Sequence, residues 1–177
     1  GLAADIGTTT VALYLCDMQS GRVLATRGFR NPQSAYGADV ISRIDKIMKD
    51  KTALSEQQRL IANAISGSVA EMCASIERKE TDVVSAVFCG NTVMQHIAAG
   101  IDPSTIANAP FIAPTLFGER YDAHALGFLK NKDAFVYFAP CFASYVGGDI
   151  ACGMIASALD ACKERVLYID VGTNGEI

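Results

Sequence analysis

Two short segments near opposite ends of the chain combine an aspartate with glycine and with hydroxyl or amide side chains. The first reads Asp5-Ile-Gly-Thr-Thr-Thr10 and follows Leu-Ala-Ala; the second reads Asp170-Val-Gly-Thr-Asn-Gly175 and follows Val-Leu-Tyr-Ile. Such apolar runs are typical of buried strands, and the glycine permits a tight turn whose N–H groups converge on an anion. Two copies separated by a domain's length predict a paired phosphate site.

The paired site would bind the phosphates of a nucleotide between its two turns. Its ligands would be Gly7, Thr8, Thr9 and Thr10 together with Gly172, Thr173, Asn174 and Gly175. Asp5 and Asp170 would approach one Mg²⁺ from opposite sides, since this ion binds carboxylates and retains water ligands. The alternative is a pair of ordinary strand-end turns with capping aspartates. The duplication favours the phosphate site.

A third polar turn, Gly90-Asn-Thr92, joins an apolar run to a helical one. Asn or Thr there is a common helix N-cap. The same turn would also lie at the carboxyl end of a strand, where open α/β sheets bind ligands. Both interpretations stay open, and so does the orientation of Asn31 and Gln33, whose loop could face a cleft or a partner. His96 is expected to pack or to be exposed, without a catalytic role.

The elements that must position these turns follow from hydrophobic periodicity and turn residues. We expect strands at 2–7, 9–17, 22–30, 82–89, 134–139 and 165–170, and helices at 38–49, 55–76, 92–99 and 145–160. Ser55 is the expected N-cap of the second helix, with Gln58 completing a capping box. Residues 101–133 contain three prolines and are expected to be irregular. This order predicts a mixed α/β sheet covered by helices.

Composition places the chain among globular proteins and narrows its partners. Of its 177 residues, 50% are hydrophobic and 19% are charged, and the formal net charge of −4 argues against nucleic-acid binding. We find no apolar run long enough for a membrane span and no signal peptide, so we expect a cytoplasmic protein. The six cysteines include no Cys-x-x-Cys, which predicts reduced thiols and no metal centre held by them.

The two aspartate-containing segments resemble the phosphate motifs of the acetate kinase, sugar kinase, heat-shock chaperone and actin (ASKHA) superfamily. The three leading strands are similar to the start of its ribonuclease H-like domain, and residues 145–160 are similar to its first connecting helix, an ordinary buried helix being the alternative. The resemblance implies a ribonuclease H-like mixed sheet with helices on both faces. Residues 1–160 would form this first actin-like ATPase domain, and residues 161–177 would start the second.

A narrower resemblance extends over nearly the whole chain, to the reductive activators of corrinoid proteins. It rests on residues 1–10, 31–33, 36–44, 90–96, 145–149 and 170–176. In that family, ATP drives an uphill electron transfer from a ferredoxin-like 2Fe-2S domain to cob(II)alamin. The resemblance implies ATP and Mg²⁺ as cofactors and a corrinoid protein as partner, and it leaves a homodimer open.

The same resemblance leads us to expect a fragment of a longer protein. The chain begins inside a strand without Met and carries neither ferredoxin cysteines nor a glycine-rich adenosine segment. We therefore expect no redox centre in it and at most a partial nucleotide site, so that ATPase activity would belong to the full-length protein.

Asp149 is the candidate catalytic residue, because ATPases of this superfamily often use a carboxylate or an amide near this point to orient the attacking water. The alternative is a favourable charge in the first turn of a helix, and Asp39 has the same ambiguity. Two other functions stay open. One is a small-molecule kinase with Asp149 as its catalytic carboxylate, and the other is a non-catalytic docking or dimerisation scaffold.

Overall fold

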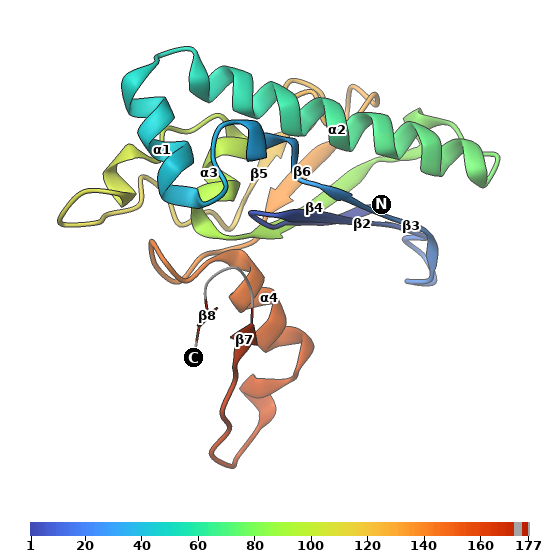
Figure 1. The fold of residues 1–177 in the computed structure, drawn as a ribbon. Coiled ribbons are helices and arrows are strands. Elements are labelled where there is room, and N and C mark those ends of the chain that lie inside the picture. The colour runs from blue at the N-terminus through green and yellow to red at the C-terminus, as the bar shows by residue number, and fades with distance from the viewer. Residues whose placement is uncertain (172–174, 177) are drawn as a thin grey trace.

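A six-stranded mixed sheet forms the centre of the protein in a computed structural model that describes residues 1–171, 175 and 176 (Figure 1). Its strand order is β3-β2-β1-β4-β6-β5. The strands are β1 (Leu2–Ile6), β2 (Thr10–Cys16), β3 (Val23–Arg30), β4 (Ser85–Gly90), β5 (Glu119–Asp122) and β6 (Phe135–Phe138). A separate hairpin pairs β7 (Asp170–Val171) with β8 (Gly175–Glu176).

The directions of the strands place the ends of three of them at one edge. β1 runs parallel to β4, and β4 runs parallel to β6, so the carboxyl ends of all three lie together. β2, β3 and β5 run antiparallel to their neighbours. The leading meander and the parallel strands confirm the expected ribonuclease H-like sheet.

Helices cover both faces of the sheet (Figure 1). One face carries α1 (Val40–Lys49), α2 (Ala53–Ser75) and α3 (Thr92–Ala99), and the other carries α4 (Gly148–Ala156). Short 3-10 helices occur at Pro32–Ala35, Glu80–Asp82, Ser104–Ile106 and Leu159–Ala161. Within the described part of the chain, no helix has both the length and the apolar character required to cross a bilayer.

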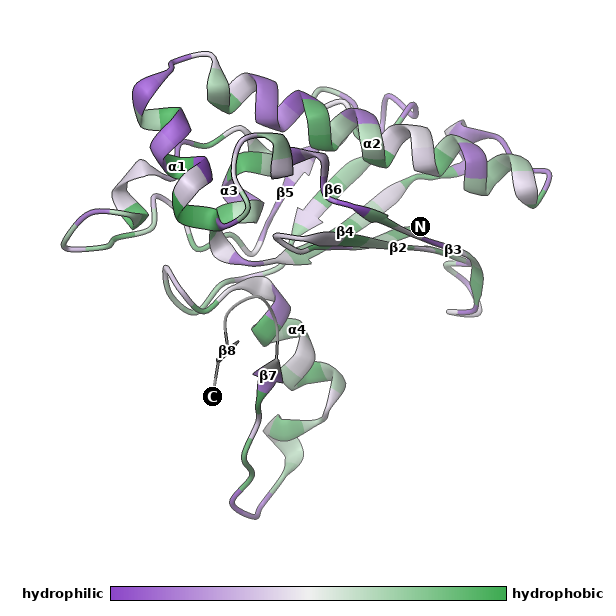
Figure 2. Ribbon diagram, viewed as in Figure 1, coloured by the Kyte–Doolittle hydropathy of each residue, from purple (hydrophilic) through white to green (hydrophobic). Residues whose placement is uncertain are grey.

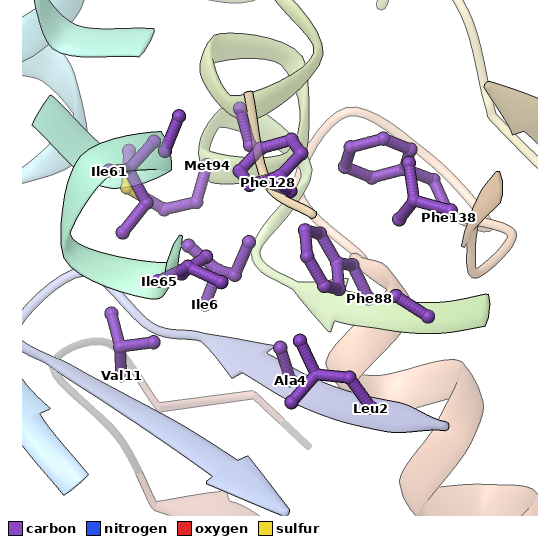
Figure 3. Packing of buried hydrophobic residues seen from close by; sticks show 14 of the residues in the cluster. Leu2, Ala4, Ile6, Val11, Ile61, Ile65, Phe88, Met94, Phe128 and Phe138 are labelled. Carbon is purple, nitrogen blue, oxygen red and sulfur yellow. The ribbon is translucent and has the colours of Figure 1, made fainter. Parts of the chain in front are cut away.

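The hydrophobic core lies between the sheet and the helices α2 and α3 (Figure 3). Alternate residues of β1 and β4 point into it. Figure 2 shows that α2 mixes polar and apolar residues along its length and that β5 is polar. Phe88 is fully buried, with Phe128 and Phe138 packed edge-on against its ring at centroid distances of 4.8 and 5.6 Å. This aromatic group anchors β4 at the centre of the sheet.

The expected start of the second helix is wrong. α2 begins at Ala53, because Asp50 accepts hydrogen bonds from the N–H and the hydroxyl of Thr52 and turns the chain earlier. Ser55 lies inside the first turn, where its hydroxyl donates to the Thr52 carbonyl. Gln58 makes no capping box; its side chain donates to the Leu126 carbonyl at 2.9 Å.

Other parts of the sequence-based prediction also differ from the structure. The strand expected at 82–89 covers Ser85–Gly90, because a 3-10 helix at Glu80–Asp82 occupies the start of that range. The helix expected at 145–160 covers only Gly148–Ala156 and ends before Ala158, which has a positive φ of 52°. The strand expected at 165–170 is limited to Asp170–Val171, because no described strand lies beside residues 165–169 to pair with them. The irregular segment contains β5, an edge strand whose polar sequence gave no period-two signal.

Replacing Phe88 tests the aromatic anchor. We expect Phe88→Ala to lower the free energy of unfolding by about 3–5 kcal/mol, because the change removes a fully buried ring and leaves a cavity. The neighbouring Val87→Ala, at a side chain that is 46% exposed, is the control and should change it by at most about 0.5 kcal/mol. Urea denaturation monitored by circular dichroism measures the free energy of unfolding of both variants. Equal losses in the two variants would contradict the assignment of Phe88 as the anchor of β4.

Candidate functional site

Three turns meet at the edge where the parallel strands end. Ile6 at the end of β1 lies beside Gly90 at the end of β4, and the segment after β6 leads to Gly147 and α4. A Cβ atom on Gly147 would lie 2.5 Å from the Gly90 carbonyl oxygen and 2.8 Å from the Thr92 nitrogen, so only glycine fits. Asn91 caps α3 through Val93 N–H, which confirms the N-cap interpretation of the Gly90-Asn-Thr92 turn. The turn also lies at the carboxyl end of β4, where ligand binding stays a prediction.

Three aspartates gather at this edge. Asp5 is exposed near the end of β1, Asp149 is half-buried in the first turn of α4, and Asp170 is half-buried in β7. Partial removal from water, followed by the charges of Asp149 and Asp170, raises the pKa of Asp5 to about 6. Burial and the charge of Asp170 also raise the pKa of Asp149, against the opposing hydrogen bond from Ile150 N–H. The site therefore concentrates negative charge that a cation would neutralise.

The geometry of the aspartates limits the kind of cation site. Within residues 1–171, 175 and 176, no set of three His, Cys, Asp or Glu side chains is placed to enclose a metal ion directly. Mg²⁺ commonly keeps several waters and takes one or two carboxylates together with substrate phosphates. Carboxylates that repel one another without a direct ligand cage fit such a hydrated ion better than a structural metal.

The turn between β1 and β2, residues 7–9, has its carbonyls fixed from one side. The Asn31 side-chain amide donates to the Gly7 carbonyl at 2.8 Å, and the Asn31 backbone N–H donates to the Thr9 carbonyl at 2.8 Å. Arg43 Nη2 donates to the Thr8 carbonyl at 2.6 Å. A trans peptide unit directs its N–H opposite its C=O. The N–H groups of Thr8 and Thr9 therefore point away from Asn31 and Arg43, as a phosphate-binding turn requires.

Gly7 is required by the shape of this turn. A Cβ atom at position 7 would lie 2.7 Å from the Thr10 carbonyl oxygen, well inside van der Waals contact. Thr8 is buried, whereas Thr9 and Thr10 are exposed. Of the four predicted ligands in this segment, Thr8 has its side chain packed inward, so its predicted role as a ligand would fall to its backbone.

The second predicted phosphate segment is described only in part. Asp170 opens β7, and Gly175 lies in β8, where it pairs with Val171. Gly172, Thr173 and Asn174 lie outside the described residues. The charge of Asp170 acts on both Asp5 and Asp149, so the first residues of the two segments, Asp5 and Asp170, are neighbours in space.

The buried polar groups behind the β1–β2 turn were not recognised from the sequence as parts of a site. Asn31, Gln33 and Arg43 are all fully buried, so the loop that could have faced a cleft or a partner packs inward. A signal was present: Arg43 lies three residues after Val40 and four before Ile47, on the buried stripe of α1. An arginine at such a position calls for specific acceptors.

Asp39 and His96 have structural roles. Asp39 is the N-cap of α1 and accepts a hydrogen bond from Ser42 N–H at 2.8 Å, which supports the helix-start interpretation. His96 is fully buried, with Nδ1 2.6 Å from the Thr92 carbonyl oxygen and Nε2 3.4 Å from Thr115 N. Burial lowers its pKa, so the ring is neutral at pH 7 and lies within α3 as a packed residue.

A pair of thiols lies beside the aspartates. Cys89 stands opposite Asp5 in the β1–β4 register, and its side chain interacts with that of Cys152 on α4. The hydrogen bond from Cys89 lowers the pKa of Cys152 to about 7 and raises that of Cys89. All six cysteines are free of disulfides.

Comparisons with known proteins give one consistent result. The family model described as the RACo middle region matches residues 1–162. The corrinoid activation enzyme RamQ of Eubacterium limosum is 35% identical over 184 residues, covering 100% of this chain and 30% of the relative. The solved structure of a reductive activator for corrinoid, iron-sulfur protein is similar with a TM-score of 0.96 and 39% identity, over 99% of this chain and 28% of that one. The chain thus spans less than a third of either relative.

The raised pKa of Asp5, caused first by partial removal from water and then by the charges of Asp149 and Asp170, makes stability depend on pH. Because the pKa of Asp5 is about 6 in the folded protein and near 3.8 in the unfolded chain, the folded state binds the extra proton between these values. The stability that this extra proton gives the folded state is therefore lost as the pH rises from 4 to 6. We expect Asp5→Asn to exceed the wild type in unfolding free energy above pH 6 by on the order of 1 kcal/mol, after allowance for solvent screening. The difference should vanish towards pH 4.

Chemical denaturation between pH 4 and 8 measures this effect. Asp39→Asn is the control: its N-cap hydrogen bonds hold the pKa of Asp39 below its usual value, so its pH profile should stay parallel to the wild type over this range. A profile for Asp5→Asn that also runs parallel to the wild type would refute the raised pKa of Asp5.

Proposed function

The chain belongs to the RACo middle region family, and on this basis we propose that it is part of an ATP-binding and ATP-hydrolysing domain that drives reductive activation of a corrinoid protein. The observation that carries the corrinoid part is the similarity to a reductive activator over 99% of this chain. The orientation of the β1–β2 turn carries the nucleotide part, because its carbonyls are held on one side and its N–H groups point to the other.

Each residue of the site has a proposed role. The backbone of Gly7–Thr10 binds phosphate from one side, and residues 172–175 do so from the other. Asp5 and Asp170 hold a hydrated Mg²⁺, which neutralises charge on the phosphates when it is bound. Asp149 orients the attacking water, and its raised pKa is consistent with a carboxyl close to other acids.

Nucleotide would act on electron transfer through conformation. In the full-length protein, ATP bound between the two ATPase domains would draw them together, and a partner state with greater affinity for the closed form would become more populated. The corrinoid cobalt would be easier to reduce in that state. Electrons would come from a 2Fe-2S domain elsewhere in the full-length protein, and this chain would contribute binding and orientation alone.

Two substitutions test the nucleotide site in the full-length protein. We expect Asp5→Ala and Asp170→Ala each to reduce Mg²⁺-dependent ATP hydrolysis at least about 100-fold, since each removes a charge that positions the ion. Phosphate release under anaerobic conditions measures turnover, and circular dichroism confirms that both variants fold.

The matched control is Asp45→Ala, which removes a carboxylate from the exposed side of α1, where it pairs with Lys49. This variant should hydrolyse ATP like the wild type. Wild-type turnover in Asp5→Ala and Asp170→Ala would reject the site, and ATP turnover without reduction of a corrinoid protein would reject the proposed activation role.

A further inference from the structure

Arg43 is a buried cation without an anionic partner. The residue is fully buried, and no described carboxylate forms an ion pair with it. Burial lowers its pKa to about 10, against the opposing charge of Asp39, which leaves the guanidinium protonated at pH 7. A buried charge without an ion pair is costly, so its retention requires hydrogen-bond acceptors.

Those acceptors belong to segments that converge behind the β1–β2 turn. Nη2 donates to the Thr8 carbonyl at 2.6 Å, and Nε donates to the Gly37 carbonyl at 3.1 Å. Nη1 donates to the Gln33 side-chain oxygen at 3.3 Å and lies 2.9 Å from the Met94 sulfur. One planar group thus ties α1, the 31–37 loop and α3 to the β1–β2 turn. A lysine cannot reproduce this, because it lacks the rigid fork of donors.

Asn31 completes the support of the turn. Its side chain and its backbone N–H hold the Gly7 and Thr9 carbonyls, and its amide also donates to the Gln33 oxygen that Arg43 contacts. With the Thr8 carbonyl on Arg43, three successive carbonyls of the turn are held by two residues. Rotation of any of these peptide units would break one of these hydrogen bonds, so the outward direction of the Thr8 and Thr9 N–H groups is fixed before an anion arrives.

We propose that Arg43, assisted by Asn31, is a positioning residue for nucleotide phosphate, which fixes the β1–β2 turn in its anion-binding shape and supplies a permanent positive charge behind it. The proposal rests on the proposed nucleotide site. Arg43 does not touch the phosphate; it acts through the peptide unit between Thr8 and Thr9. Asp39 acts on the guanidinium only at a distance, without an ion pair, and the Arg43 side chain is fully buried, so its field extends to the anion with less screening than that of an exposed charge.

Substitutions of Arg43 in the full-length protein test this role. We expect Arg43→Met to weaken Mg²⁺–ATP binding about 10- to 100-fold, the range typical of residues that support a ligand shell. Arg43→Lys keeps the charge but loses the planar fork of donors, so its affinity for Mg²⁺–ATP should lie between those of Arg43→Met and the wild type. Arg43→Lys also provides the test if Arg43→Met does not fold. Calorimetric titration with Mg²⁺–ATP gives the affinities, and hydrogen exchange of a peptide spanning residues 7–10 should rise in both variants without nucleotide.

Ile65→Ala is the control for lost stability. Ile65 is fully buried in α2, so its truncation destabilises the core but leaves in place the hydrogen bonds from Asn31 and Arg43 to the β1–β2 turn. Its affinity for Mg²⁺–ATP should remain that of the wild type. Wild-type affinity in Arg43→Met, or equal weakening in Ile65→Ala, would overturn the positioning role alone. Failure of the wild type to bind Mg²⁺–ATP would overturn the proposed function, and the positioning role with it.

Discussion

The parallel pairing of β1 with β4 is the constraint on which the candidate site depends. It aligns Asp5 with Cys89 and Ile6 with Gly90, so the turn after each strand emerges at the same edge. β6 extends the parallel set and directs the chain to Gly147, whose missing side chain lets α4 begin against the β4–α3 turn. Asp5 and Asp149, which are far apart in sequence, become electrostatic neighbours as a result.

The polar cluster behind the β1–β2 turn is the second determinant of the site. Most of the core follows the ordinary rule of apolar packing, yet Asn31, Gln33 and Arg43 are fully buried beside it. Proteins depart from that rule chiefly where function requires it. Here the departure holds three carbonyls inward and leaves a positive charge beneath the turn, while aspartates gather at the edge of the sheet where β1 ends. An anion that carries a divalent cation would complement both features: the anion would face the positively charged turn, and the cation would face the aspartates.

Much of the fold could be predicted from sequence, because the apolar runs of β1, β2, β4 and β6 and the amphipathic helices are local signals. Long-range contacts could not be predicted in this way. The run at 165–169 has the composition of a buried strand, but a strand also needs a neighbour to pair with. The carboxylates of Asp5 and Asp170 were predicted from their motifs, whereas the role of Arg43 depends on the carbonyl of Thr8, 35 residues away. The hydrophobic periodicity of α1 indicates that Arg43 is buried, but it does not identify the groups that accept its hydrogen bonds.

A crystal structure of the full-length protein with Mg²⁺ and a non-hydrolysable ATP analogue tests the nucleotide site most directly. The terminal phosphates should lie against the N–H groups of Thr8 and Thr9, on the side opposite Arg43. Hydrated Mg²⁺ should lie beside Asp5 and Asp170. Phosphates bound away from the β1–β2 turn, or a turn whose Thr8 carbonyl faces the nucleotide, would contradict the proposed site.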